Sequence, residues 1–303
     1  MSAVPIGRSA TRRAWVRRTF LVGAFAAAAS SGAAHAESDD EFTAGGYRLV
    51  WSDEFTEDGP PDESSWNFES GFVRNRELQW YQEENAFCED GRLVIEARRE
   101  RRPNPDFNQP PRRGLQEWGV KRKAAQYTSA SLHTGGKQDW RYGRFVAKAR
   151  IPIDPGAWPA FWTVGYGKWP AAGEIDIMEY YRGSILANAA WLGSNQKIVW
   201  YAAKMPLTEL GEPGWASRFH VWRMDWTPDA IELYADDLLV NRIDVARATG
   251  SGGLGENPFR KPQYIRLNLA VGGVHGGDPS SAAFPIRYEV DYVRVYQLAP
   301  SEE

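Results

Sequence analysis

The sequence predicts a mostly β protein, folded as a sandwich of two sheets. Most segments are short β-prone runs that are separated by Gly, Pro, Asn and Asp. No helical periodicity is sustained over more than about ten residues. The number and spacing of the runs fit two packed sheets. In chain order, the clearest expected strands are 93–97, 143–151, 185–191, 220–226, 230–235, 264–270 and 288–296.

The first 36 residues are predicted to be a signal peptide and not part of the fold. They hold five arginines and no acid, then the apolar stretch 20–29, then Ala34-His35-Ala36, a small-x-small cleavage pattern. The run Arg17-Arg18-Thr19-Phe20-Leu21 also resembles a twin-arginine export signal. We therefore expect residues 37–303 to form a single domain that is secreted or periplasmic.

The composition of the remaining chain narrows the class of partner. No later stretch is apolar for the length that a membrane span requires. Removal of the five leader arginines takes the formal charge from −3 to −8, which argues against nucleic acid or an anionic membrane. Cys88 is the only cysteine, so no intramolecular disulfide forms, and no basic neighbour lowers its pKa. We interpret Cys88 as structural.

Three segments interrupt the run of strands. Residues 98–123 carry four prolines and many basic residues, and we interpret them as an irregular, solvated insertion; binding of an anionic polymer is the alternative. Residues 250–258 have the composition of a loop. The glycine-rich run 272–277 lacks the Lys-Ser/Thr of a phosphate-binding loop, and we expect a turn that borders a cleft.

Aromatic residues are more numerous than a core of this size normally uses. Thirteen tryptophans remain after the leader, and several stand beside turn residues, which favours stacking on sugar rings. The leading segment is 156–162, followed by Trp80-Tyr81, Trp169 and Trp191. Filling of the sandwich core is the alternative for any one of them. Alternation places Phe161 and Trp162 on opposite faces, so one of the two is expected in the core.

The segment 173–180 reads Gly-Glu-Ile-Asp-Ile-Met-Glu-Tyr and carries three carboxylates. In a regular strand Glu174 and Asp176 share one face, and Glu179 points to the other. A β-bulge near Ile177 and Met178 would bring Glu179 round to join them. The alternative is an exposed edge strand, but the apolar residues between the acids indicate a reverse face in the core.

Three carboxylates on one face suit glycoside hydrolysis. Mutual repulsion and burial disfavour the charged forms, so at least one acid is expected to keep its proton near neutral pH. An ionised and a protonated carboxyl together supply the attacking oxygen and the proton for the departing oxygen. The four histidines show no metal-ligand spacing, and no Gly-x-Ser-x-Gly motif is present.

These residues resemble glycoside hydrolase family 16, the β-jelly-roll endoglycanases whose concave cleft holds a bulged Glu-x-Asp-x-x-Glu strand. Glu174, Asp176 and Glu179 match that pattern. The resemblance runs from about 47 to 297. It includes Trp51-Ser52-Asp53-Glu54-Phe55, Glu77-Leu78-Gln79-Trp80-Tyr81, Tyr127-Thr128-Ser129-Ala130, Tyr142-Gly143-Arg144-Phe145, Trp158-Pro159-Ala160-Phe161-Trp162 and 288–296.

The resemblance implies roles for individual residues. Glu174 would be the nucleophile, Glu179 the general acid and then base, and Asp176 the neighbour that tunes the nucleophile, with retention of anomeric configuration. Asn75, Trp158, Trp162 and Asn188 would line the cleft. Some relatives bind a structural calcium, at positions matching Glu54, Gly91 and Asp291, and the resemblance leaves this ion open. Catalysis would need no cofactor.

The sequence therefore predicts a retaining endo-glycosidase that cuts a polysaccharide, with β-1,3- or mixed-linkage glucan as the first choice and a monomer as the expected state. Many β-1,3-glucanases of the family carry a histidine where this chain has Asn188. This departure weakens the prediction that laminarin is the substrate. The alternatives are a β-galactan hydrolase of the agar or porphyran type, a transglycosylase, or a non-catalytic lectin on the same scaffold.

Overall fold

The computed structural model describes residues 42–110, 116–211, 214–248 and 256–299. The predicted signal peptide lies outside these ranges, as do residues 111–115 of the predicted insertion and most of the loop expected at 250–258. Within the described ranges, no helix has the length and apolar character needed to cross a membrane.

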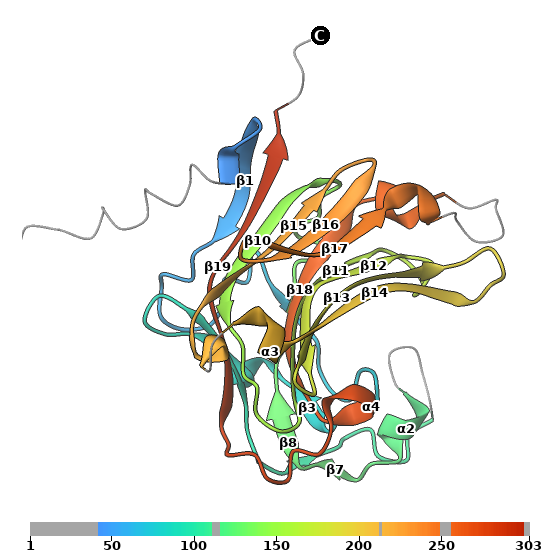
Figure 1. Cartoon of the computed structure of the whole chain (residues 1–303). Coiled ribbons are helices and arrows are strands. Elements are labelled where there is room, and N and C mark those ends of the chain that lie inside the picture. Colours follow the sequence, from blue (N-terminus) through green and yellow to red (C-terminus); the bar gives the residue numbers. More distant parts are fainter. Residues whose placement is uncertain (1–41, 111–115, 212–213, 249–255, 300–303) are drawn as a thin grey trace, which may run out of the picture. The chain divides into compact units, whose positions relative to one another are not determined.

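Two antiparallel sheets form the body of the domain, which confirms the predicted fold class (Figure 1). The first follows the order β17 (Leu238–Asp244), β16 (Ala230–Ala235), β15 (His220–Trp226), β10 (Gly143–Arg150), β19 (Ile286–Leu298), β5 (Leu93–Ala97) and β4 (Ala86–Cys88), with β1 (Tyr47–Asp53) also paired to β19. The second follows β14 (Ile198–Pro206), β13 (Ser184–Leu192), β12 (Glu174–Tyr181), β11 (Ala157–Gly165), β18 (Gln263–Val271), β9 (Ser131–His133) and β2 (Asn67–Phe68).

The remaining elements are short. They are the parallel pair β3 (Gln79–Tyr81) and β8 (Tyr127–Ser129), the antiparallel pair β6 (Arg102–Pro103) and β7 (Ala124–Ala125), the helices α2 (Glu117–Val120), α3 (Leu207–Leu210) and α4 (Gly273–Gly276), and the 3-10 turns η1 (Glu83–Asn85), η2 (Trp215–Ser217), η3 (Val245–Arg247) and η5 (Pro258–Arg260). Every strand expected from the sequence is present within two residues of its predicted bounds.

The core lies between the two sheets. One cluster of buried side chains joins Phe145 and Ala147 of β10 to Phe161 of β11 and Ile175 of β12. Along β11, Phe161 is fully buried in this cluster, whereas Trp162 belongs to a separate group on the opposite face. The prediction that one of these two rings fills the core is therefore confirmed.

Replacing Phe161 with Ala is expected to lower the free energy of unfolding by about 3–5 kcal/mol, because it removes a fully buried ring and leaves a cavity. Urea unfolding followed by tryptophan fluorescence measures the change. Leu239→Ala on β17 is the control, since its side chain is 43% exposed and the loss should stay within about 0.5 kcal/mol. Equal losses in the two variants would contradict this placement of Phe161.

The glycine-rich turn borders the acidic face, as predicted. Gly273 in α4 has a φ of 69°, and a Cβ at this position would lie 2.8 Å from the carbonyl oxygen of Asn75. The close approach lets the amide of Val274 donate to that same oxygen at 2.9 Å. Only glycine at 273 leaves room for this hydrogen bond, which fixes the backbone of Asn75 next to α4.

The basic insertion does more than face solvent. The guanidinium of Arg122 donates to the backbone carbonyls of Arg76 and Glu77, and it lies over the rings of Phe72 and Trp118. The interpretation of this segment as a solvated loop is wrong for Arg122. Its side chain braces the loop that carries Asn75 and Glu77.

Cys88 behaves as a structural residue. Its side chain is buried on β4, and it forms no disulfide. Burial raises the pKa of the thiol to about 12, so the reactive thiolate is scarce at neutral pH.

Candidate active site

A β-bulge in β12 places the three acids on one face. On the β11 side, Met178 lies opposite Phe161 and Asp176 lies opposite Trp162, so one extra residue is accommodated between them. The register against β13 shifts at the same place, between Asp176 and Glu179. Ile177 and Met178 are both buried in the core. The predicted bulge is confirmed, and Glu179 joins the face of Asp176.

Cross-strand pairing sets the neighbours of each acid. Asp176 is in register with Asn188 on β13 and with Trp162 on β11. Glu179 is in register with Ala160, which in turn pairs with Asn268 on β18. Directly opposed residues of antiparallel strands share a face, so aromatic and amide groups flank the carboxylates on both sides.

The acids surround a small recess of about 50 Å³. Three strands of the second sheet and the loop before β3 contribute its lining. The lining residues are Arg74, Asn75, Glu77, Trp158, Ala160, Trp162, Glu174, Asp176, Glu179 and Asn268.

Hydrogen bonds fix the orientation of Glu179. The indole Nε1 of Trp158 donates to its Oε1 at 2.9 Å. The side-chain amide of Asn188 donates to its Oε2 at 3.2 Å and to Oδ2 of Asp176 at 3.4 Å. Because each oxygen of Glu179 has a fixed donor, its carboxyl group is held toward the recess.

Burial shifts the titration of all three acids in the same direction. It raises the pKa of Glu174 to about 7, and the charge of Glu179 adds to this rise. Burial, together with the neighbouring Glu179 and Glu174, raises the pKa of Asp176 well above its usual range. Burial also raises the pKa of Glu179, against the opposing effect of its hydrogen bonds. The group therefore retains protons near neutral pH.

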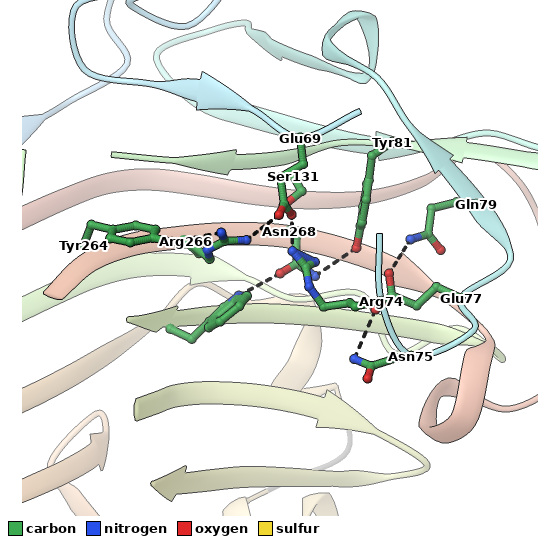
Figure 2. Close-up of polar contacts among 11 residues, drawn as sticks. Glu69, Arg74, Asn75, Glu77, Gln79, Tyr81, Ser131, Tyr264, Arg266 and Asn268 are labelled. Atoms are coloured by element: carbon green, nitrogen blue, oxygen red, sulfur yellow. Dashed lines mark hydrogen bonds and ion pairs between the residues drawn. The ribbon is translucent and has the colours of Figure 1, made fainter. Parts of the chain in front are cut away.

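Two arginines, Arg74 and Arg266, share the carboxylate of Glu69 (Figure 2). Glu69 accepts from Arg74, from Arg266 at 2.6 Å and from the hydroxyl of Ser131 at 2.7 Å. Burial alone would raise the pKa of Glu69, but the two cations lower it to about 2. The guanidinium carbons of Arg74 and Arg266 lie 5.3 and 4.9 Å from the ring centre of Trp162. Both cations also act to lower the pKa of Glu174.

The structure brings most of the predicted binding residues to the recess. Asn75, Trp158 and Trp162 line it. Asn188 does not line it: the residue is buried beside the acids, 3% exposed, and its amide donates to them. Among the other tryptophans named from the sequence, Trp169 is exposed, whereas Trp80 and Trp191 are buried.

Sequence reasoning missed four of the lining residues. Arg74 and Glu77 flank Asn75 along the chain, so their position next to a predicted binding residue was an available signal. Ala160 stood inside the aromatic segment 156–162. Asn268 lies in a strand whose sequence marks only a buried element, and no local pattern singles it out.

The calcium site stays a prediction. The carboxylate of Glu54 forms two hydrogen bonds of 2.9 Å with Arg294, and that of Asp291 pairs with Lys148 at 2.8 Å. Both carboxylates are therefore already neutralised by cations. No cluster of three or more His, Cys, Asp or Glu side chains suited to a metal occurs among the described residues.

A larger hollow of about 750 Å³ lies elsewhere, next to α3 and η2. Its acidic residues are Asp154 and Glu289, and Glu289 is ion-paired with Arg150. It offers no facing pair of free carboxyls. The recess on β12 is therefore the candidate for chemistry despite its smaller volume.

Comparison with known proteins gives a consistent result. The family profile described as Glycosyl hydrolases family 16 matches residues 113–294. A beta-glucanase of Rhodothermus marinus is 37% identical over 86% of this chain and 88% of that protein.

Two solved structures extend the likeness to the fold. The laminarinase catalytic domain of Thermotoga maritima is 33% identical, with a TM-score of 0.67 over 84% of this chain and 99% of that one. A chain from a study of endo-acting O-glycanases that initiate mucin breakdown in the human gut microbiota is 31% identical. Its TM-score is 0.75 over 84% of this chain and 92% of that chain.

Proposed function

Because this chain belongs to glycosyl hydrolase family 16, we propose that it hydrolyses internal linkages of a β-glucan with retention of configuration. The observation that carries the proposal is the bulge in β12, which sets Glu174, Asp176 and Glu179 on one face beside Trp162. A binding module has no use for an acid and a nucleophile side by side.

In the first step, a carboxylate oxygen of Glu174 attacks the anomeric carbon. The glycosidic C–O bond breaks as Glu179 transfers its proton to the leaving oxygen, and a covalent glycosyl-enzyme forms. The setting supports this division of roles. Arg74 and Arg266 favour the ionised form of Glu174, whereas burial favours the protonated form of Glu179.

In the second step, Glu179 takes a proton from water as the water oxygen attacks the anomeric carbon from the opposite side. The bond to Glu174 breaks, its carboxylate returns to the ionised form, and Glu179 is protonated again. Asp176 and Asn188 hold Glu179 in position through hydrogen bonds. If a sugar hydroxyl replaced water in this step, the outcome would be transglycosylation.

The relatives support β-1,3- or mixed-linkage glucan as the substrate. The Rhodothermus protein is a beta-glucanase, and the Thermotoga structure is a laminarinase. The test is incubation of the purified protein with laminarin, lichenan, agarose, porphyran and carrageenan, followed by sizing of the products. We expect short oligosaccharides from laminarin or lichenan. Cleavage of a galactan alone would overturn the glucan assignment, and cleavage of none would favour a lectin.

The acid limb of kcat/KM is expected near pH 7, because Glu174 must lose its proton before it attacks and its pKa is raised to about 7. Activity should therefore rise as pH increases through that value. Arg74→Met removes one cation that lowers this pKa, so the limb should move to higher pH. A pH series on the purified variants measures the shift.

Two variants make that shift interpretable. Arg74→Lys keeps the charge and should hold the limb close to its original position. Arg76→Met changes an exposed neighbour and should leave it in place. A limb that is unmoved in Arg74→Met would show that the cation does not set the ionisation of Glu174.

Export, oligomeric state and metal content remain predictions. The signal peptide predicted in residues 1–36 supports a secreted or periplasmic enzyme. We propose a monomer that needs no cofactor for the chemistry. A structural calcium at Glu54, Gly91 and Asp291 is testable by metal analysis of the purified protein.

A further inference from the structure

Two tryptophans are exposed beside the acidic strand. Trp169 lies in the loop between β11 and β12 and is 42% exposed, and Trp200 on β14 is 49% exposed. Their ring centres are 6.4 Å apart, with the planes inclined at 52°. Exposed apolar side chains that adjoin one another form a patch of the kind that marks a binding site.

The strand register connects this pair to the acids. Glu174 on β12 lies opposite Ala190 on β13, and Ala190 lies opposite Trp200 on β14. The three residues therefore share the face that carries the recess. Trp200 stands two strands away from Glu174, which is about 9.5 Å between backbones.

Trp169 connects Glu174 to Trp200. Its indole donates a hydrogen bond to the carboxylate of Glu174, and its ring contacts Trp200. Glu174 and Trp200 flank Ala190, which is fully buried. An aromatic surface therefore runs from Glu174 to the edge strand β14.

A small residue and a cation continue the same face along β14. Ala202 and Lys204 follow Trp200 at alternate positions, and both are exposed. An indole ring with a small residue and an ammonium group beyond it matches a pyranose, whose flat face is apolar and whose rim carries hydroxyls. The net negative charge of the chain favours a neutral sugar over an anionic one.

We propose that Trp169 and Trp200 form a subsite for a sugar residue of the glucan, on the β14 side of the scissile bond. This inference rests on the proposed function. The distance from Glu174 means that the subsite takes a sugar other than the one whose anomeric carbon reacts. Such a contact exists equally in the ground and transition states, so it strengthens binding and leaves the bond-breaking step unchanged.

Trp200→Ala is the test, because the ring is on the surface and its loss should leave the fold intact. For laminarin we expect KM to rise about tenfold at unchanged kcat. For an aryl β-glucoside, whose single sugar fills only the site of the reacting anomeric carbon, kcat/KM should change little. Trp200→Phe should restore most of the affinity, and Leu239→Ala, an equally exposed change on the first sheet, should have no effect. Equal losses on both substrates, or no loss on either, would overturn the subsite.

Binding measurements separate this inference from the proposed function. In a Glu174→Ala background, calorimetric titration with laminarihexaose should show weaker binding when Trp200 is also replaced. Identical affinities of the Glu174→Ala protein with and without the Trp200 replacement would refute the subsite, whatever the activity of the unaltered enzyme. If the unaltered enzyme cleaves none of the glucans and yet the affinities differ, the subsite stands and the hydrolase proposal fails.

Discussion

Replacing Glu174 with Ala is expected to reduce kcat/KM on β-glucan by at least about 10⁴-fold, because the attacking oxygen is lost. The side chain is partly exposed at the edge of the recess, so the protein should stay folded. Reducing-sugar release and the melting temperature are measured together. Glu84→Ala, which removes an exposed glutamate on η1, serves as the matched control and should retain full activity. Persistent cleavage in Glu174→Ala would remove Glu174 from the mechanism.

Azide provides a positive signal for the same residue. In the space vacated by the carboxylate, azide attacks the anomeric carbon while Glu179 still donates its proton, and the product is a glycosyl azide of inverted configuration. NMR of the product identifies the anomer. Formation of an inverted sugar by the unaltered enzyme would exclude the covalent route altogether.

Glu179→Gln should lower kcat on natural glucan by about 10²–10⁴-fold, since the amide cannot protonate the leaving oxygen. Its amide oxygen can still accept from the indole of Trp158, and its amide nitrogen can donate to Oδ1 of Asn188 once the Asn188 amide turns over, so the size and position of the side chain are preserved. The basic limb of the pH profile, which reports the loss of this proton, should vanish. Steady-state rates across pH measure both effects.

The leaving group distinguishes an acid from a positioning residue. An aryl glucoside with an acidic phenol needs little protonation, so Glu179→Gln should form its glycosyl-enzyme nearly as fast as the unaltered enzyme. A burst of phenol followed by slow turnover is the expected time course. Equal losses on aryl and natural substrates would assign Glu179 a structural role.

Local patterns in the sequence are enough to predict most of the fold and the three acids at the centre of the site. Alternating β-branched residues between turn formers predict the strands, since each strand buries one face. The bulge followed from chemistry, because only a shift of one residue places Glu179 with Glu174 while Ile177 and Met178 enter the core. The same alternation separated Phe161 from Trp162.

What the sequence did not reveal depends on contacts between distant segments. Glu69, Arg74 and Arg266 meet across nearly two hundred residues of chain, and no local pattern pairs them. Arg122 looked like one basic residue among many, yet it braces a neighbouring loop through backbone carbonyls. Trp200 became notable only when the pairing of β13 with β14 put it in register with Glu174.

The bulge in β12 also makes the enzyme sensitive to chain length at one point. Removal of a single residue between Asp176 and Glu179 would restore strict alternation and keep Glu179 on the face of Asp176, whereas removal of both Ile177 and Met178 would turn the carboxyl of Glu179 toward the apolar interior and bring Tyr180 out to the substrate side. A deletion in the loop before Gly173 would leave the alternation of side chains along β12 unchanged. Accordingly, homologous sequences and engineered chimeras should tolerate either one or two residues between Asp176 and Glu179, and should lose activity when none is left.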